Sequence, residues 1–196
     1  MTNRQVVAAI FDFDGTLVDS DEALVAPFIT LGVPREQISF GHAVAPECER
    51  LGISLDAYVD AYDTEVTRPF PGVLAMLGSL GRWAICSNKH PKSAQAEVTR
   101  LGWHPEVAMY ADAFDWHHKS LGSMLTLMGL SAAQVVMVGD SNGDAECASE
   151  VGCEMVWAGW NPRVRDSDPS ERLLEGIVLD EPGDLFALFP GLRLVG

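Results

Sequence analysis

Lysine is scarce in this chain, and basic residues as a group are outnumbered by acidic ones. The 196 residues include 13 lysines and arginines against 28 aspartates and glutamates, which gives a formal net charge of −15. The lysines are Lys89, Lys92 and Lys119. Because an acidic surface repels phosphate backbones and anionic membranes, we expect neither nucleic acid nor a membrane as a partner. An anionic substrate would need local positive charge at its site.

Paired cysteines and long apolar runs are also missing. Cys48, Cys86, Cys147 and Cys153 show no Cys-x-x-Cys spacing, so the sequence predicts neither a structural zinc site nor a redox pair. Buried free thiols in a reducing compartment are expected. No apolar run reaches membrane-spanning length, and the opening residues lack the apolar core of a secretory signal. We therefore expect a cytoplasmic protein.

What the chain does contain is an alternation of strand-like and helix-like segments. With 47% hydrophobic residues it can bury a substantial core. Short apolar runs predict strands at 6–11, 83–86, 107–110, 135–138 and 154–158. Helical patterns lie at 72–80, 92–101, 120–130 and 144–151, several of them ending in glycine. This alternation predicts an α/β fold with a doubly wound parallel sheet.

One interval breaks the alternation, since residues 20–68 contain no convincing strand. Apolar residues recur there at helical spacing after Ser54, a plausible N-cap, and Pro27 interrupts or kinks an earlier helix. We expect residues 20–68 to form a small helical cap on a core made of residues 1–19 and 69–196. Further along, 161–172 is predicted to be an exposed loop, and 182–189 a closing helix.

The most informative motif is Asp12-Phe13-Asp14-Gly15-Thr16, which follows the first predicted strand. Residues two apart on a strand share a face, so both carboxylates can converge on one ligand beyond the strand end. Paired carboxylates repel unless a cation compensates, and Mg²⁺ prefers such oxygen ligands. The motif could equally be a polar turn, because Asp and Gly are ordinary turn residues.

Polar residues also follow two later strands. Ser87 and Asn88, after the second strand, can donate hydrogen bonds to a phosphate oxygen or can cap the next turn. Asp140 follows a buried strand and a glycine, as Asp12 follows its strand, and Asp144 is favoured in the first turn of a helix even without a function. Lys119, at the start of the preceding helix, is a candidate to offset these carboxylates, although surface lysines are commoner.

In this order, the motifs resemble those of the haloacid dehalogenase superfamily of phosphohydrolases. The resemblance covers nearly the whole chain, and the Asp-x-Asp motif is similar to the phosphatase branch. It implies that Asp12 is a nucleophile that forms an aspartyl-phosphate, and that Asp14 protonates the leaving group and then activates water. It also implies that Asp12, Asp140 and the Asp14 backbone carbonyl bind Mg²⁺, with Asp144 supporting the metal.

The resemblance further implies that Gly15, Thr16, Ser87 and Asn88 hold the phosphoryl oxygens and that Lys119 balances charge. Lys119 departs from the family pattern, because Ser120 stands where a proline is frequent. Its neighbours His117 and His118 are expected to be structural or surface residues rather than metal ligands.

The implied substrate is a small phosphorylated metabolite, with phosphoglycolate one candidate among related sugar phosphates. A phosphosugar mutase or phosphotransferase of the same fold, and a binding protein without turnover, are the alternatives. Cap residues that could contact the substrate are Arg35, His42, Arg50 and Arg68, although solvated surface charge is the simpler interpretation. The oligomeric state stays open.

Overall fold

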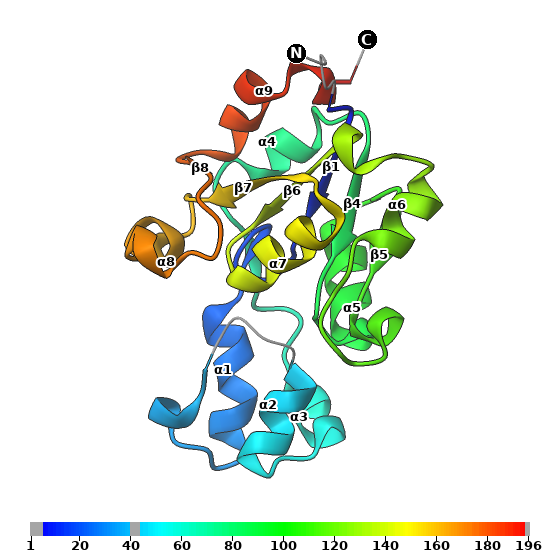
Figure 1. Cartoon of the computed structure of the whole chain (residues 1–196). Coiled ribbons are helices and arrows are strands. Elements are labelled where there is room, and N and C mark those ends of the chain that lie inside the picture. The colour runs from blue at the N-terminus through cyan, green and yellow to red at the C-terminus, as the bar shows by residue number, and fades with distance from the viewer. Residues whose placement is uncertain (1–5, 40–43, 195–196) are drawn as a thin grey trace.

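A single parallel sheet organises the computed structural model, which describes residues 6–39 and 44–194 (Figure 1). Its strand order is β5-β4-β1-β6-β7-β8, and every neighbouring pair is parallel. The strands are β1 (Ala8–Phe11), β4 (Trp83–Cys86), β5 (Val107–Met109), β6 (Val135–Gly139), β7 (Glu154–Ala158) and β8 (Ile177–Leu179). Because β1 lies between β4 and β6, the residues that follow these three strands meet at one edge of the sheet.

Helices cover both faces of the sheet, as the alternating segments predict. Successive β1 residues belong to different cores, with Phe11 packing on one side and Ile10 on the other. The core helices are α4 (Val73–Leu77), α5 (Pro91–Leu101), α6 (Gly122–Met128), α7 (Asn142–Val151), α8 (Pro162–Arg165) and α9 (Leu185–Leu188). Residues of α4, α5 and α9 share the core of Phe11, whereas residues of α6 and α7 share that of Ile10. The α/β, doubly wound prediction is confirmed.

A separate group of helices lies beyond the carboxyl edge of the sheet (Figure 1). We call it the helical lobe; it contains α1 (Asp21–Thr30), the 3₁₀ turn η1 (Arg35–Gln37), α2 (Val44–Leu51) and α3 (Leu55–Ala61). It has its own apolar cluster, in which Phe28 and Tyr58 pack with ring centroids 4.5 Å apart. Two short antiparallel strands, β2 (Val18–Asp19) and β3 (Arg68–Pro69), pair where the chain enters and leaves it.

The sequence predictions hold for most elements and fail at a few. The five expected strands are present, and the Ser54 hydroxyl accepts a hydrogen bond from the Ala57 amide at 3.4 Å, as an N-cap does. Helix α1 continues through Pro27 and is not interrupted there. Strand β8 escapes prediction because it is a three-residue edge strand whose first residue, Ile177, is exposed.

Two further expectations need correction. Residues 161–172 are not simply an exposed loop, because Asn161 and Val164 are buried and α8 begins there. The helix expected from Ser120 begins at Gly122, which leaves Lys119 in the preceding loop. The remaining 3₁₀ turns are η2 (Ala111–Phe114), η3 (Ala132–Gln134), η4 (Pro169–Glu171), η5 (Pro182–Asp184) and η6 (Pro190–Leu192). The expected closing helix is η5 followed by α9.

The cysteines are free and mostly buried, as the sequence predicts. All four cysteines are free thiols; Cys48, Cys86 and Cys147 are buried, and Cys153 is half-buried. Burial raises the pKa of the Cys86 thiol to about 12 and that of Cys48 to about 11. Within residues 6–39 and 44–194, no helix combines the length and apolar character needed to cross a membrane.

Candidate active site

A cavity lies between the carboxyl edge of the sheet and the helical lobe. Asp12 follows β1, Ser87 follows β4 and Asp140 follows β6, and all three line the cavity. The lobe contributes Leu24, Val44, Tyr58 and Tyr62 to its wall. This is where ligands bind in open parallel sheets. The cavity therefore joins the acidic sheet edge to a largely apolar and aromatic surface of the lobe.

The first group of charges in this cavity is the Lys119 cluster, which consists of Lys119, Asp12 and Asp144. The Lys119 ammonium lies 2.9 Å from Asp12 Oδ1 and 2.5 Å from Asp144 Oδ1. The Lys119 side chain is only 3% exposed, and Asp144 is fully buried. The structure thus brings together three residues that are distant in sequence, and each of them was a predicted site residue.

Burial and the attraction between opposite charges compete in the Lys119 cluster. Burial raises the pKa of Asp12 from 3.8 to about 6, because desolvation outweighs the attraction of Lys119, while the Asp144 carboxylate raises that pKa further. For Lys119 burial acts in the opposite direction, yet the two carboxylates prevail and hold its pKa well above the usual range. Lys119 therefore stays cationic.

Asp144 also fixes the loop that carries Asp140. Its Oδ2 accepts hydrogen bonds from the backbone amides of Asp140 (3.1 Å) and Ser141 (2.9 Å) and from the Ser141 hydroxyl (2.7 Å). The backbone of Gly139 passes so close that a Cβ atom there would lie 2.2 Å from Asp144 Cγ. Glycine is needed at this position because the carboxylate occupies the space of a side chain.

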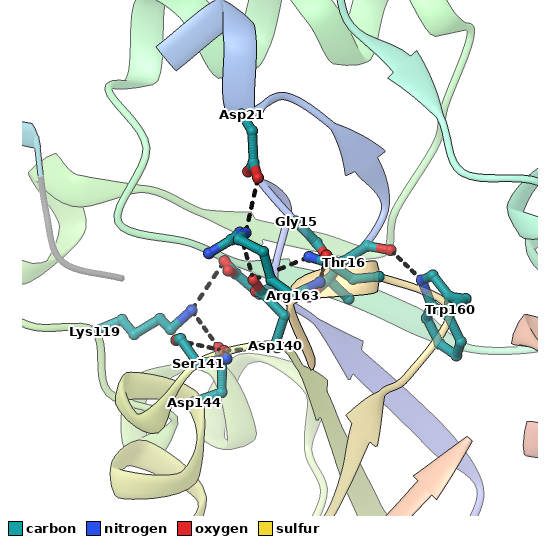
Figure 2. A network of polar contacts seen from close by, with 11 residues as sticks. Gly15, Thr16, Asp21, Lys119, Asp140, Ser141, Asp144, Trp160 and Arg163 are labelled. Atoms are coloured by element: carbon teal, nitrogen blue, oxygen red, sulfur yellow. Dashed lines mark hydrogen bonds and ion pairs between the residues drawn. The ribbon is translucent and has the colours of Figure 1, made fainter. Parts of the chain in front are cut away.

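The Asp140 carboxylate accepts hydrogen bonds from Thr16, in the turn after β1, and from Arg163 of α8. The Thr16 hydroxyl donates to its Oδ1 at 3.2 Å, and Arg163 Nη2 donates to its Oδ2 at 2.9 Å. Arg163 Nε also lies 2.8 Å from Asp21 Oδ2, at the start of α1, so Figure 2 shows Arg163 between Asp140 and Asp21. Burial, reinforced by nearby carboxylates, raises the pKa of Asp140 well above its ordinary value.

The turn after β1 approaches Asp140 closely. Gly15 has φ +77°, and a Cβ atom there would lie 2.3 Å from Asp140 Oδ2. The Gly15 carbonyl accepts a hydrogen bond from Asn161 Nδ2 at 2.7 Å, and the Thr16 carbonyl accepts one from Trp160 Nε1 at 2.8 Å. Gly15 and the fully buried Thr16 thus shape the turn beside Asp140.

Sequence reasoning missed Asn161 and Arg163 because their segment was interpreted as an exposed loop. The Asn161 side chain accepts from the Arg163 amide at 2.9 Å and caps α8, whose first residue is Pro162. Asparagine followed by proline is a standard signal for a helix start. That signal could have identified α8, although not the ion pair to Asp140.

The second group of charges is the Lys89 cluster, which consists of Lys89, Asp14, Glu97 and Tyr62. Lys89 Nζ lies 2.7 Å from Asp14 Oδ1, 3.1 Å from Asp14 Oδ2, 2.8 Å from the Tyr62 hydroxyl and 3.2 Å from Glu97 Oε2. The Lys89 side chain is 3% exposed and Glu97 is fully buried. Sequence reasoning did not assign Lys89, Glu97 or Tyr62 to the site.

Ser87 and Asn88 lie between the two clusters in the chain and line the cavity. Ser87 is buried, and its hydroxyl accepts a hydrogen bond from the Lys89 amide at 3.3 Å. Asn88 Oδ1 is buried, and no hydrogen-bond partner lies within reach among the described residues. Both residues line the cavity, where the Ser87 hydroxyl and the Asn88 amide nitrogen could donate to an anion.

The residues at the sheet edge fit a hard divalent cation. Asp12, Asp140 and Asp144 each offer a carboxylate oxygen, and these oxygens lie within 4.8 Å of one another. Oxygen donors of this kind suit Mg²⁺. The Asp14 carboxylate instead faces Lys89, which leaves its side chain apart from this group.

The remaining candidates lie away from the cavity wall. His117 and His118 are exposed, and His118 Nε2 lies 3.0 Å from Glu150 Oε1. Arg35 pairs with Glu22, Arg50 pairs with Glu47, and Arg68 donates to the Glu65 and Thr67 carbonyls. These arginines thus bind partners in or beside the lobe. His42 lies outside the described residues.

Comparison with known proteins gives consistent matches. The family model of haloacid dehalogenase-like hydrolases matches residues 9–158. A phosphoglycolate phosphatase from Xanthomonas campestris pv. campestris (strain 8004) is 28% identical over 209 residues, covering 91% of this chain and 94% of the relative. Another from Mesorhizobium japonicum is 30% identical over 200 residues, covering 82% and 87%.

Solved structures agree on the fold. A hydrolase from Pseudomonas syringae superimposes with a TM-score of 0.74 at 18% sequence identity, and the match covers 97% of this chain and 100% of that one. At this identity the likeness concerns the fold alone. Together with the family match, these findings confirm the superfamily resemblance and the hydrolase class predicted from the motifs.

Proposed function

This chain belongs to the haloacid dehalogenase-like hydrolase family, and we propose that it is a Mg²⁺-dependent phosphatase of a small phosphorylated metabolite that acts through an aspartyl-phosphate. The observation that carries the proposal is the convergence of Asp12, Asp140 and Lys119 at the cavity floor. A nucleophile, an oxygen-donor group for a cation and a buried ammonium are the parts that phosphoryl transfer requires.

In the first step, an Asp12 carboxylate oxygen attacks phosphorus. The bond between phosphorus and the leaving oxygen breaks, and its electron pair stays on that oxygen. The Asp14 carboxyl group then donates a proton to the leaving oxygen, which departs as an alcohol. Asp12 is well placed for this role because it follows β1 and lines the cavity, where Lys119 orients it.

In the second step, the Asp14 carboxylate accepts a proton from water as the water oxygen attacks the phosphorus of the aspartyl-phosphate. The bond between phosphorus and the Asp12 oxygen breaks, which releases phosphate and restores the Asp12 carboxylate. Asp14 ends the cycle with the proton it began with. The separation of Asp12 and Asp14 into different clusters supports this division of roles.

Other residues supply charge and hydrogen bonds. Asp12, Asp140 and the Asp14 backbone carbonyl would hold Mg²⁺, with Asp144 in support, and the bound ion would neutralise phosphoryl charge. Ser87, Asn88 and the turn at Gly15 and Thr16 would contact the phosphoryl oxygens.

We propose phosphoglycolate as the first substrate to test, because both relatives described above carry that name. Residues 20–68 would act as a cap whose inner surface contacts the leaving group and excludes water. The free cysteines support a reducing, cytoplasmic setting.

The test is release of phosphate by the purified protein from glycolate, sugar, nucleotide and amino-acid phosphates. We expect activity that requires Mg²⁺, is removed by a chelator, and falls at least ~10³-fold in Asp12→Asn. Turnover that survives the chelator would refute the metal assignment. No turnover on the whole panel, together with phosphate binding, would favour the binding-protein alternative. Transfer of the phosphoryl group to a second sugar instead of water would favour the mutase.

A further inference from the structure

We infer that Lys89 is a positioning residue that fixes the Asp14 carboxyl group for proton transfer to the leaving oxygen. The inference rests on the proposed function, because it assigns Asp14 the acid-base role. It concerns Lys89 and its buried partners Glu97 and Tyr62, which the phosphoryl-transfer steps above do not use.

The contact between Lys89 and Asp14 involves both carboxylate oxygens, at 2.7 and 3.1 Å. The Asp14 side chain is 15% exposed and that of Lys89 is 3% exposed, and both residues line the cavity. A carboxylate on a turn can otherwise rotate about two side-chain bonds. Two contacts to a buried ammonium that has other partners restrict that rotation and hold the carboxyl group at the cavity wall.

Lys89 is fixed in turn by residues from several elements. Glu97 comes from α5, and its Oε2 lies 3.2 Å from the ammonium. Tyr62, the residue that follows α3, places its hydroxyl at 2.8 Å and its ring centroid at 4.5 Å from Lys89 Nζ. The Phe13 ring lies 5.4 Å from Lys89 Nζ. The ammonium is therefore held by partners from several parts of the fold at once.

Both carboxylate oxygens of Glu97 have partners, because Oε1 accepts hydrogen bonds while Oε2 lies beside Lys89. Its Oε1 accepts hydrogen bonds from the Tyr62 hydroxyl at 2.9 Å and the Thr67 hydroxyl at 3.0 Å. These bonds hold the Glu97 carboxylate in place beside Lys89, and so they help to fix the ammonium that contacts Asp14.

A purely structural role explains the Lys89 cluster less well. Burying an ammonium and a carboxylate is costly, and apolar residues of similar size often stabilise a core as well or better. The nearby Lys92 shows the ordinary alternative, because it pairs with Asp60 of α3 at 2.9 Å while its side chain is 67% exposed. Lys89 and Lys92 both connect the core to the lobe, but only Lys89 touches a residue of the Asp-x-Asp motif.

The experiment compares kcat/KM for two substrates in the full-length wild type and in the Lys89→Met, Asp14→Asn and Lys92→Met variants. One substrate is 4-nitrophenyl phosphate, whose phenolate departs without a proton; the other is the best alkyl phosphate from the screen. We expect Lys89→Met to lose ~10–100-fold on the alkyl phosphate and less than ~3-fold on the aryl phosphate. Lys92→Met should match the wild type on both.

Two further variants keep the inference falsifiable. Combining Lys89→Met with Asp14→Asn should be no worse on the alkyl phosphate than Asp14→Asn alone, because both changes remove the same proton transfer. If Lys89→Met fails to fold, Lys89→Met with Glu97→Gln removes the uncompensated charge and takes its place. Equal losses of kcat/KM on both substrates, or additive losses in the double variant, would overturn the inference.

The design separates this inference from the function on which it rests. If Asp14→Asn shows no dependence on the leaving group, the proposed role of Asp14 fails. If Asp14→Asn shows that dependence and Lys89→Met does not, Lys89 does not position Asp14 and the proposed phosphatase mechanism stands.

Discussion

The two clusters at the sheet edge are similar in composition and different in what they connect. Each places a buried ammonium, 3% exposed, against two carboxylates: Lys119 against Asp12 and Asp144, and Lys89 against Asp14 and Glu97. The residues of the Lys119 cluster all come from the sheet core. The Lys89 cluster also includes Tyr62 of the lobe.

This difference supports the two separate roles proposed for the aspartates of one short motif. Asp12 and Asp14 lie two residues apart, yet each contacts a different lysine and a different second carboxylate. Asp12, the proposed nucleophile, contacts Lys119 of the sheet core. Asp14, the proposed acid-base group, contacts Lys89, which is bonded to Tyr62 beside α3, so we expect its position to depend on how the lobe sits on the core.

The largest expected effect comes from removing the Lys119 ammonium. Lys119→Met leaves the carboxylates of Asp12 and Asp144 buried without their ammonium, which should lower the free energy of unfolding by ~3–5 kcal/mol. It should also lower kcat by ~10²–10³-fold on aryl and alkyl phosphates alike, because charge stabilisation is lost whatever the leaving group. Urea unfolding and steady-state kinetics measure both quantities.

Lys119→Arg is the matched control, since it keeps the charge but not the compact geometry. A loss in Lys119→Met that appears only with alkyl phosphates would remove the distinction between the two clusters.

The next effect is a dependence of stability on pH that arises in the Lys119 cluster. Between pH 3.8 and about 6 the unfolded chain releases the Asp12 proton while the folded protein retains it. The free energy of unfolding should therefore fall as pH rises through this range, by ~2–3 kcal/mol, and then level off. Urea unfolding with chelator from pH 4 to 7 measures this, with Asp12→Asn as the reference. A constant difference between the two proteins would contradict the prediction.

The sequence was sufficient for the sheet because its signals are local. Each central strand is a short apolar run that ends at a polar residue, and parallel connections then bring Asp12, Ser87 and Asp140 to one edge without further information. Strand β8 has no such signal, because its pairing to β7 is set by tertiary contacts. Residues 161–172 were misjudged because their composition is polar, although Asn161 is buried against the turn at Gly15.

The candidate site was predictable only where its residues belong to motifs. Lys119 could be proposed from the order of the motifs, but its contact with Asp12 depends on a turn in which Asp115 and Trp116 both have positive φ, at 52° and 63°. Such a conformation is uncommon for these residues and is not visible in the sequence. Glu97 and Tyr62 carry no motif, since a glutamate in a helix and an aromatic residue in a lobe have many ordinary roles. Their part in the site follows only from distances.

The smallest expected effect tests the link between the Lys89 cluster and the lobe. Tyr62→Phe removes the hydroxyl that contacts Lys89 and donates to Glu97, which should cost ~1–2 kcal/mol of unfolding free energy. It should also lower kcat/KM ~3–10-fold on the alkyl phosphate and less on the aryl phosphate, because Lys89 then holds Asp14 less firmly.

Tyr58→Phe provides the comparison for Tyr62→Phe, because the Tyr58 hydroxyl donates to the Leu24 carbonyl at 3.0 Å, entirely within the lobe. Thermal or urea unfolding should show a loss of stability of the same order in both variants, since each loses one hydroxyl group from a buried tyrosine. Only Tyr62→Phe should distinguish the two substrates. If both tyrosine variants change the alkyl-to-aryl ratio equally, the lobe affects Asp14 through its packing as a whole rather than through the Tyr62 hydroxyl.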